Sequence, residues 1–176
     1  MLATVVFVAF LTLPILAHPG PNPACSSWTD SILNSDHTKC YSAYQASATF
    51  EHANAMCEQL GGSLASLHSR EDNALATYLA LDGLYWTGGK KVNGRWTWID
   101  DSPFDYDYFG AEMPEDPTCE NWCILIDMKY RNWTKAGCDT TQNFVCEKHV
   151  TPRFSESHLE AYKNVIQGFN LSYYVS

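Results

Sequence analysis

Residues 50–66 read FEHANAMCEQLGGSLAS and combine a helix, a stop signal and the start of a strand. Apolar side chains recur at spacings of three and four residues, as in an amphipathic helix; they are Phe50, Ala53, Met56, Cys57 and Leu60. Thr49 can cap the N-terminus of this helix, and the Gly-Gly pair that follows Leu60 ends it. The pattern therefore predicts that Cys57 faces the core and that a short strand follows at 63–67.

A second helix is predicted directly after this strand. Ser69 can cap it, because Asp72 follows three residues later and forms an acidic variant of the capping box. Asp-Gly at 82–83 ends the helix. Apolar spacing places three side chains on its inner face, which are Leu75, Tyr78 and Leu79.

The next part of the chain has the pattern of strands. Short aromatic or β-branched runs are separated by Gly-Gly, Asn-Gly and Asp-Ser-Pro, and these runs are 84–87, 95–99, 123–126 and 144–146. Between them, residues 100–120 form a long connection with eight carboxylates and no lysine or arginine. Loops of this length in a compact domain are usually functional or held by a ligand. The order of elements predicts an α+β fold.

Residues 1–17 have the composition of a secretory signal peptide. No charge occurs between Leu2 and Ala17, the apolar run is shorter than the roughly 20 residues of a membrane-spanning helix, and Pro14 would break it. A membrane anchor is the alternative interpretation. We expect a secreted, extracellular protein that is not inserted in a membrane, with residues 18–24 as a proline-rich leader.

The chain is acidic, with 20 Asp and Glu against 11 Lys and Arg, a formal net charge of −9 and a pI near 4.9. Nucleic acid is excluded as a partner because its phosphates would be repelled, and anionic membrane surfaces are disfavoured for the same reason. The sequence has no Gly-x-Ser-x-Gly elbow, no His-Glu-x-x-His pair and no phosphate-binding Gly-Lys-Ser/Thr. We therefore predict a non-enzymatic protein without a cofactor.

An oxidising compartment would make the seven cysteines disulfide candidates. They are Cys25, Cys40, Cys57, Cys119, Cys123, Cys138 and Cys146. Seven is an odd number, so at least one cysteine cannot pair within the chain. Counting alone cannot choose among the many possible pairings.

A series of motifs resembles, in order, those of C-type lectin domains. The motifs are Cys25-Ser-Ser-Trp28 with Cys40-Tyr41, Leu60-Gly-Gly-Ser-Leu-Ala-Ser66, Tyr85-Trp-Thr-Gly88, Gly94-Arg-Trp-Thr-Trp98, Asp101-Ser-Pro103, Trp133 with Cys138, and Phe144-Val-Cys-Glu147. The resemblance covers residues 25–148 and is to the long form of the family. It implies a C-type lectin-like fold of two helices and two small antiparallel sheets with a long loop region, stapled by disulfides.

The resemblance also implies three disulfides, Cys25–Cys40, Cys57–Cys146 and Cys123–Cys138. The second would close the largest loop and join the first helix to the last strand. Cys119 is left over, although it could compete with Cys123 for Cys138. Our leading hypothesis for Cys119 is an intermolecular bridge that gives a covalent homodimer, and a capped or free thiol is the alternative.

Members of this family often hold a sugar through calcium, a cation that takes six to eight oxygen ligands. At the matching positions Pro114 keeps the family's proline, but Met113 offers no side-chain oxygen and Asn121 offers one neutral amide. Thr134 and Lys135 stand where the family has an asparagine and an aspartate. An ammonium would repel a divalent cation, so we predict that the consensus calcium site is absent.

The family's auxiliary calcium site keeps an acidic residue at Asp116, whereas Lys91 stands at another of its positions. We hypothesise that Lys135 replaces calcium by pairing with Glu115 in the long loop. Calcium could instead bind a different ligand set, for which the candidates are Glu112, Glu115, Asp116, Glu120 and Asn121. The simpler interpretation is that these acidic residues are only solvated.

Recognition of a sugar without calcium would use aromatic faces, for which Tyr106, Tyr108 and Phe109 are candidates. Packing in the loop or core is the alternative role for these rings. Two Asn-x-Ser/Thr sequons predict N-glycosylation at Asn132 and Asn170. A glycan on Asn132 would lie beside the surface where sugar-binding relatives hold their ligands.

The chain leaves the resemblance after residue 148. The C-terminal tail, residues 149–176, contains a capping pattern at Ser157 followed by apolar residues on one helical face. We predict one short amphipathic helix there. It could dock on a partner, dimerise, or pack against its own domain.

We therefore predict a secreted, non-enzymatic recognition module of C-type lectin type that binds an extracellular glycan or protein ligand without the consensus calcium site. The candidate ligand-binding residues are Glu112, Pro114, Glu115, Asp116, Glu120, Asn121, Thr134 and Lys135. The main alternative is a calcium-dependent carbohydrate-binding lectin, and loss of binding in a chelator would distinguish the two. A third interpretation is a structural, matrix-associated protein that self-assembles.

Overall fold

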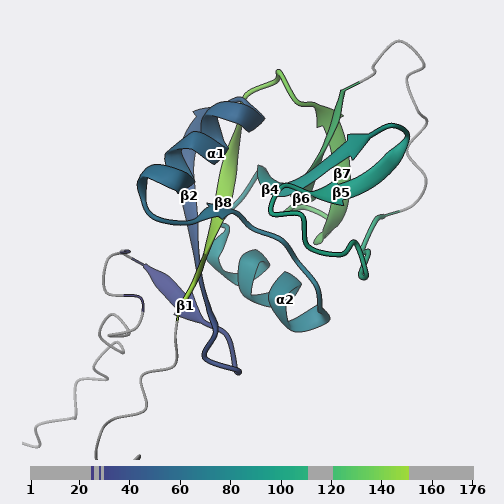
Figure 1. The fold of residues 1–176 in the computed structure, drawn as a ribbon. Helices are drawn as coiled ribbons and strands as arrows, with labels where there is room; N and C mark the ends of the chain where they lie inside the picture. The colour runs from purple at the N-terminus through teal and green to yellow at the C-terminus, as the bar shows by residue number, and fades with distance from the viewer. Residues whose placement is uncertain (1–24, 26–27, 29, 111–120, 151–176) are drawn as a thin grey trace, which may run out of the picture.

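The computed structural model describes Cys25, Trp28 and residues 30–110 and 121–150. These residues form two helices and eight strands (Figure 1). In chain order the elements are β1 (Ser31–Leu33), β2 (Lys39–Ala48), α1 (Phe50–Gln59), β3 (Ser63–Leu64), α2 (Arg70–Leu79), β4 (Leu84–Val92), β5 (Arg95–Trp98), β6 (Trp122–Asp127), β7 (Asn132–Gly137) and β8 (Gln142–His149). The predicted α+β class is confirmed. The predicted signal peptide, leader and tail helix lie outside the described residues.

The strands form one connected sheet rather than two separate ones. The order is β1-β2-β8-β4-β6-β7, with β3 paired to β8 and β5 paired to β4. All neighbours are antiparallel except β4 and β8, which pair in parallel at Tyr85 with Asn143 and Trp86 with Phe144. This short parallel ladder joins the two antiparallel sheets that the resemblance implies. Figure 1 shows β8 running through the middle of the molecule beside β2.

Both predicted helix starts are present in the structure. The Thr49 hydroxyl accepts a hydrogen bond from the His52 N–H, and the Ser69 hydroxyl accepts one from the Asp72 N–H. The inward position predicted for one apolar residue of α2 is wrong, because the Tyr78 side chain is 79% exposed. α2 instead buries Asp72, Asn73 and Ala76, so its inner face is mostly polar and hydrophobic spacing could not identify it.

Side chains of successive strand residues point to opposite faces of the sheet, and they form two separate clusters. On β8, Phe144 and Cys146 belong to the cluster that includes buried residues of α1, whereas Val145 belongs to the one that includes buried residues of α2. We call these the α1 cluster and the α2 cluster. On β6 the same alternation separates Leu125 from Ile124. The sheet therefore has a helix on each face.

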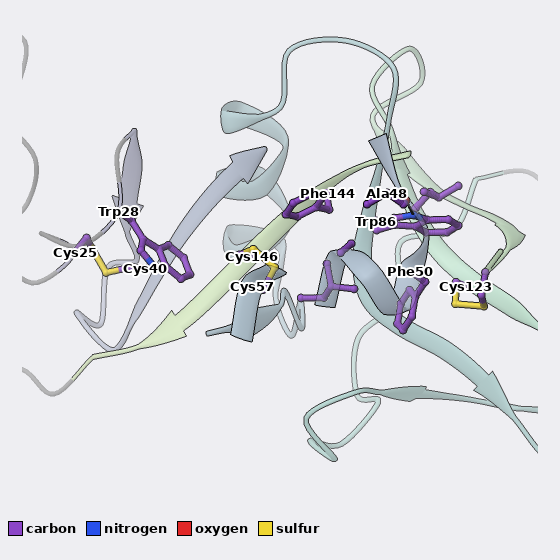
Figure 2. Packing of buried hydrophobic residues seen from close by; sticks show 14 residues of the cluster. Cys25, Trp28, Cys40, Ala48, Phe50, Cys57, Trp86, Cys123, Phe144 and Cys146 are labelled. Carbon is purple, nitrogen blue, oxygen red and sulfur yellow. Dashed lines mark hydrogen bonds between the residues drawn. A yellow bond between two sulfur atoms is a disulfide. The ribbon is translucent and has the colours of Figure 1, made fainter. Parts of the chain in front are cut away.

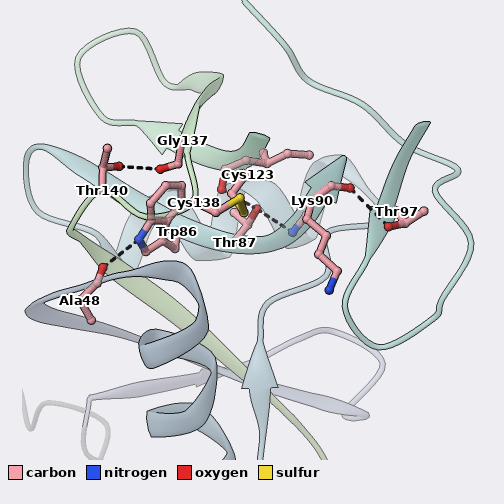
Figure 3. Close-up of a disulfide and its surroundings, with 11 residues drawn as sticks. Ala48, Trp86, Thr87, Lys90, Thr97, Cys123, Gly137, Cys138 and Thr140 are labelled. Atoms are coloured by element: carbon pink, nitrogen blue, oxygen red, sulfur yellow. Dashed lines mark hydrogen bonds between the residues drawn. A yellow bond between two sulfur atoms is a disulfide. The ribbon is translucent and has the colours of Figure 1, made fainter. Parts of the chain in front are cut away.

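Three disulfides are present in the structure, and they are the pairs that the resemblance implies. They are Cys25–Cys40, Cys57–Cys146 and Cys123–Cys138. All six sulfurs belong to the α1 cluster, which Figure 2 shows extending from Cys25 and Trp28 past Phe144 to Trp86. Cys57–Cys146 joins α1 to β8 across 89 residues of sequence. Figure 3 shows Trp86 beside Cys123–Cys138, and its indole N–H donates to the Ala48 carbonyl at 2.9 Å.

Within the described residues no helix is long and apolar enough to cross a membrane.

Candidate functional site

Three of the predicted ligand-binding residues lie on the hairpin of β6 and β7. Asn121 immediately precedes β6, and its backbone carbonyl accepts a hydrogen bond from the Cys138 N–H at 3.1 Å. Thr134 pairs with Leu125 in the ladder and is buried, whereas Lys135 pairs with Ile124 and is partly exposed. The hairpin therefore places Thr134 and Lys135 on opposite faces of the sheet.

The Lys135 ammonium lies over the indole ring of Trp122, 5.1 Å from the ring centroid. This is a cation–π contact across the β6–β7 ladder. At the matching positions this chain offers an ammonium from Lys135, one neutral amide from Asn121, and the hydroxyl of Thr134, which is buried on the opposite face. Calcium needs six to eight oxygens, with carboxylates among them. The described donor set therefore does not fit the family's calcium ion.

The other predicted residues of this site lie outside the described residues. They are Glu112, Pro114, Glu115, Asp116, Cys119 and Glu120. The proposed pairing of Lys135 with Glu115 therefore stays a prediction, as do calcium binding by the acidic residues and the bridge through Cys119. The sequon at Asn170 also lies outside. Asn132 opens β7 and is partly exposed, with its amide packed close to the backbone of Gly110.

Two of the three aromatic residues considered for sugar stacking pack against the buried ring of Trp133, and the third packs on one of these two. Tyr106 and Phe109 make edge contacts with it, with ring centroids 5.7 Å and 5.6 Å away. Tyr108 stacks on Tyr106 and keeps 40% of its surface exposed. The packing role is therefore present for all three rings, and Tyr108 also presents surface to solvent. A hydrogen bond to α2 holds the Trp133 ring in place, because its indole N–H donates to Asn73 Oδ1 at 2.8 Å.

A chain of polar side chains ties the beginning of the long connection to the segment before α2. His68 Nδ1 lies 2.8 Å from Asp105 Oδ1, and His68 Nε2 lies 3.0 Å from the Ser102 hydroxyl oxygen. The sequence does not reveal this chain of contacts, because its members match no known motif spacing. The order of contacts is that of a Ser-His-Asp triad. Asp100 competes with His68 for the Ser102 proton, however, so the arrangement suits a structural clamp.

The two carboxylates of this clamp are held in their charged forms. The hydrogen bond from His68 lowers the pKa of Asp105. Partial burial raises the pKa of Asp100, but hydrogen bonds from the Ser102 hydroxyl and backbone N–H outweigh it, so this pKa also lies below its ordinary value. The clamp therefore contains two ionised carboxylates on one stretch of loop.

A buried ion pair between Lys39 and Glu147 lies on the face of the sheet that α2 covers. The Glu147 side chain is fully buried, and both its oxygens lie 3.1 Å from the Lys39 ammonium. Burial raises the pKa of Glu147 to about 7, although the charge of Lys39 opposes this shift. Asp100 and His149 are near enough to form a metal-ligating trio with Glu147. The Lys39 ammonium bound to Glu147 would oppose a cation there, so the trio is not a metal site.

Comparison with known proteins places this geometry in a family. Residues 46–148 match the model of the Lectin C-type domain. The galactose-specific lectin nattectin of Thalassophryne nattereri is 29% identical over 120 residues, which are 64% of this chain and 76% of nattectin. A type-2 ice-structuring protein of Brachyopsis segaliensis is 30% identical over 115 residues, 62% of this chain and 66% of that protein.

Solved structures agree. A calcium-independent type II antifreeze protein superposes with a TM-score of 0.62 at 27% identity, covering 70% of this chain and 95% of its own. The match of the family model covers more than half of the chain, and the disulfides and strand order described above lie within or beside the matched region. This chain belongs to the C-type lectin domain family.

Proposed function

We propose that this protein is a secreted, non-enzymatic recognition module that binds an extracellular glycan or protein ligand without calcium at the consensus position. The observation that carries the proposal is the ammonium of Lys135, which lies over Trp122 where the family has a carboxylate ligand. Thr134 is buried on the opposite face of the sheet, so the described part of the site offers the Lys135 ammonium and the Trp122 ring rather than a calcium cage.

Two similarities support this proposal. Nattectin is a galactose-specific lectin, so a relative 29% identical recognises a sugar. The antifreeze protein is calcium-independent, so a chain 27% identical holds the fold without that ion. The N-terminal residues 1–17 and the three disulfides suit a protein that folds in an oxidising, secretory compartment.

The experiment is a screen of the glycosylated protein against a glycan array and a panel of extracellular proteins, in EDTA and in calcium. We expect the same ligands to be bound in both conditions, with binding reduced by Lys135→Ala. Lys129→Ala is the matched control, because the Lys129 ammonium also lies over an aromatic ring, that of Tyr130, at 4.8 Å. Binding that disappears in EDTA would contradict the proposal and favour the calcium-dependent lectin.

Thermal unfolding provides a second readout that needs no ligand. Calcium at about ten times its dissociation constant would add roughly 1.4 kcal/mol to the free energy of unfolding and raise Tm by about 3–6 °C. We expect no rise between EDTA and millimolar calcium. A rise of this size would show that the acidic loop binds calcium despite Lys135.

The covalent homodimer belongs to the same proposal. The six other cysteines pair with one another, which leaves Cys119 for a bridge to a second chain. We expect a dimer band on a non-reducing gel that disappears with reductant and in Cys119→Ser. A monomer band for the unreduced wild type would contradict the bridge.

A further inference from the structure

A hollow of about 420 Å³ lies between α2 and the turn that joins β6 to β7. Its walls come from one side of α2, from the residues that follow this helix, from Tyr108 and from the β6–β7 turn; they include Arg70, Thr77, Tyr78, Leu81, Tyr108 and Arg131. The volume is in the range of small-ligand sites, roughly 300–1,000 Å³. Of the residues that the sequence suggested for ligand binding, Tyr108 is among the lining, as one of the aromatic candidates for sugar stacking.

Two guanidinium groups line the hollow, those of Arg70 and Arg131. Within the described part of the chain neither of them forms an ion pair. The whole chain has 20 acidic residues against 11 basic ones, so two arginines at one hollow without an acidic partner among the described residues are unexpected. Guanidinium groups bind carboxylate and sulfate groups through paired, charge-assisted hydrogen bonds. The charge of the hollow therefore complements an anion.

The backbone at Arg131 belongs to the tight turn between β6 and β7. Its φ is 56°, in the left-handed region that favours glycine and asparagine. The Arg131 N–H donates to the Asp127 carbonyl at 2.6 Å, which closes the turn. This conformation is common at the end of a hairpin turn, and Asp30, His37, Asn93 and Asp101 share it, so the turn alone accounts for it.

Exposed rings and alkyl groups form the rest of the hollow's rim. Tyr78 is 79% exposed, Leu81 is 71% exposed and Tyr108 is 40% exposed. Tyrosine rings stack on the apolar faces of sugar rings, and their hydroxyls bond to sugar hydroxyls. An extended peptide would need an unpaired strand edge, and a helix would need a continuous apolar groove. The lining offers neither, since it comes from one helix side and turns.

We infer that this hollow binds an anionic saccharide of one or two rings that carries a carboxylate or sulfate group. Arg70 and Arg131 bind the anionic group, and Tyr78 and Tyr108 contact the ring. A long polyanion does not fit, because the net charge of −9 would repel the part that extends beyond the hollow. Lys135 does not line this hollow, so the inferred saccharide site does not depend on the proposed function.

The test measures binding to the full chain in EDTA by calorimetry. The probes are glucuronic acid, N-acetylglucosamine 6-sulfate, neutral N-acetylglucosamine and a pentaglutamate peptide. We expect the two anionic sugars to bind at least tenfold more tightly than the neutral sugar, with affinity falling as salt is raised to 0.5 M. Arg70→Gln and Arg131→Asn should each weaken this binding about tenfold or more.

Arg131→Asn separates binding from folding, because asparagine tolerates the left-handed backbone better than arginine does. Its Tm should equal or exceed that of the wild type while its affinity falls about tenfold or more. Arg95→Gln is the matched control, since Arg95 is an exposed arginine on β5 outside the hollow, and its affinity should be unchanged. Lys135→Ala should also leave this binding unchanged, which separates the site from the proposed function.

Three results would overturn the inference. The first is anionic sugars binding no better than neutral N-acetylglucosamine. The second is wild-type affinity in both Arg70→Gln and Arg131→Asn. The third is binding of pentaglutamate alone, which would make the hollow a site for an acidic peptide.

Discussion

The two faces of the sheet are held together by different means. The α1 cluster contains all six disulfide-bonded cysteines, and its other buried members are apolar. The α2 cluster contains none of these cysteines and is built around Trp98 and Trp133, with buried polar groups of α2 beside it. The described part of the long connection packs on this second cluster, through Phe104, Tyr106 and Phe109. Covalent links thus stabilise one face, while the face that carries the loop depends on ring packing and specific hydrogen bonds.

This difference matters for recognition. A disulfide stabilises the fold by reducing the conformational entropy of the unfolded chain, whatever side chains lie beside it. A packed ring or a buried hydrogen bond instead favours one particular arrangement of side chains. The loop rests on a surface whose shape is set by the second kind of contact. Substitutions on the α2 face should therefore alter the loop, and those on the α1 face should alter stability alone.

The largest effect is expected when Cys57 and Cys146 are both replaced by alanine. Their bond closes a loop of 89 residues, which in the chain-entropy model contributes about 4–5 kcal/mol. Replacing Cys25 and Cys40, only 15 residues apart, should remove about 3 kcal/mol. Urea unfolding of the two double variants measures both values. Equal losses would contradict a stabilisation that depends on loop length.

Removing one buried tryptophan from each face is expected to separate stability from loop order. Trp86→Ala and Trp133→Ala should each lower the free energy of unfolding by about 3–5 kcal/mol, since both rings are fully buried. Only Trp133→Ala should speed proteolytic cleavage within residues 100–110, because Phe104 and Tyr106 contact that ring. Faster cleavage there in Trp86→Ala would break the distinction between the two faces.

A pH dependence is expected on the α2 face from Glu147. Its pKa is raised from 4.5 to about 7, so the folded state holds the proton more tightly than the unfolded state. This contribution to stability is complete below pH 4.5 and is lost as the pH rises through 7. The free energy of unfolding should be about 1–3 kcal/mol higher at pH 5 than at pH 8.

The comparison variants for this titration are Glu147→Gln and Glu51→Gln. Urea unfolding from pH 4.5 to 8 should lose its slope in Glu147→Gln and keep it in Glu51→Gln, since Glu51 is an exposed residue of α1. Asp100 and Asp105 have lowered pKa values, so their contributions are lost only below pH 3.8 and do not overlap this range. An unchanged slope in Glu147→Gln would assign the effect to another group.

The smallest effects are expected for the buried asparagine of each helix. Asn54 Oδ1 accepts from the Leu64 N–H at 3.1 Å, and Asn73 Oδ1 accepts from the Trp133 indole at 2.8 Å. Replacing either by alanine leaves a buried donor without its partner and should lower the free energy of unfolding by about 1–2 kcal/mol. Only Asn73→Ala should shift the indole N–H resonance of Trp133, as measured by NMR. A shift of similar size in Asn54→Ala would show that the two faces are coupled.

Short sequence patterns predicted the helix starts, which depend on residues close together in the sequence. The caps at Thr49 and Ser69 follow from the side-chain chemistry of the first helical turn. The inner face of α2 could not be predicted in this way. Asp72 lies on that face, where it accepts a hydrogen bond at 2.7 Å from the Tyr41 hydroxyl, and Tyr41 is 31 residues away in the sequence. Strands β2 and β7 were not predicted as such, since their burial comes from partners across the sheet.

The candidate site was predictable only in part for a similar reason. Family positions identified Thr134 and Lys135, but the stacking of Lys135 on Trp122 depends on the register of two strands. The clamp of His68, Ser102 and Asp105 joins residues up to 37 positions apart and has no sequence motif. Contacts of this kind are specified by the tertiary fold, which no short pattern contains.

The central place of β8 has a consequence for the order of folding. This strand is synthesised after every other described element, yet it lies between β2 and β4 and joins the two halves of the sheet. Until residues 142–149 leave the ribosome, the first half of the chain has no partner for β2 on that edge, and Cys57 has no Cys146 to meet. The sheet can therefore close only after residues 142–149 have been made, and until then Cys57 must not pair with another cysteine.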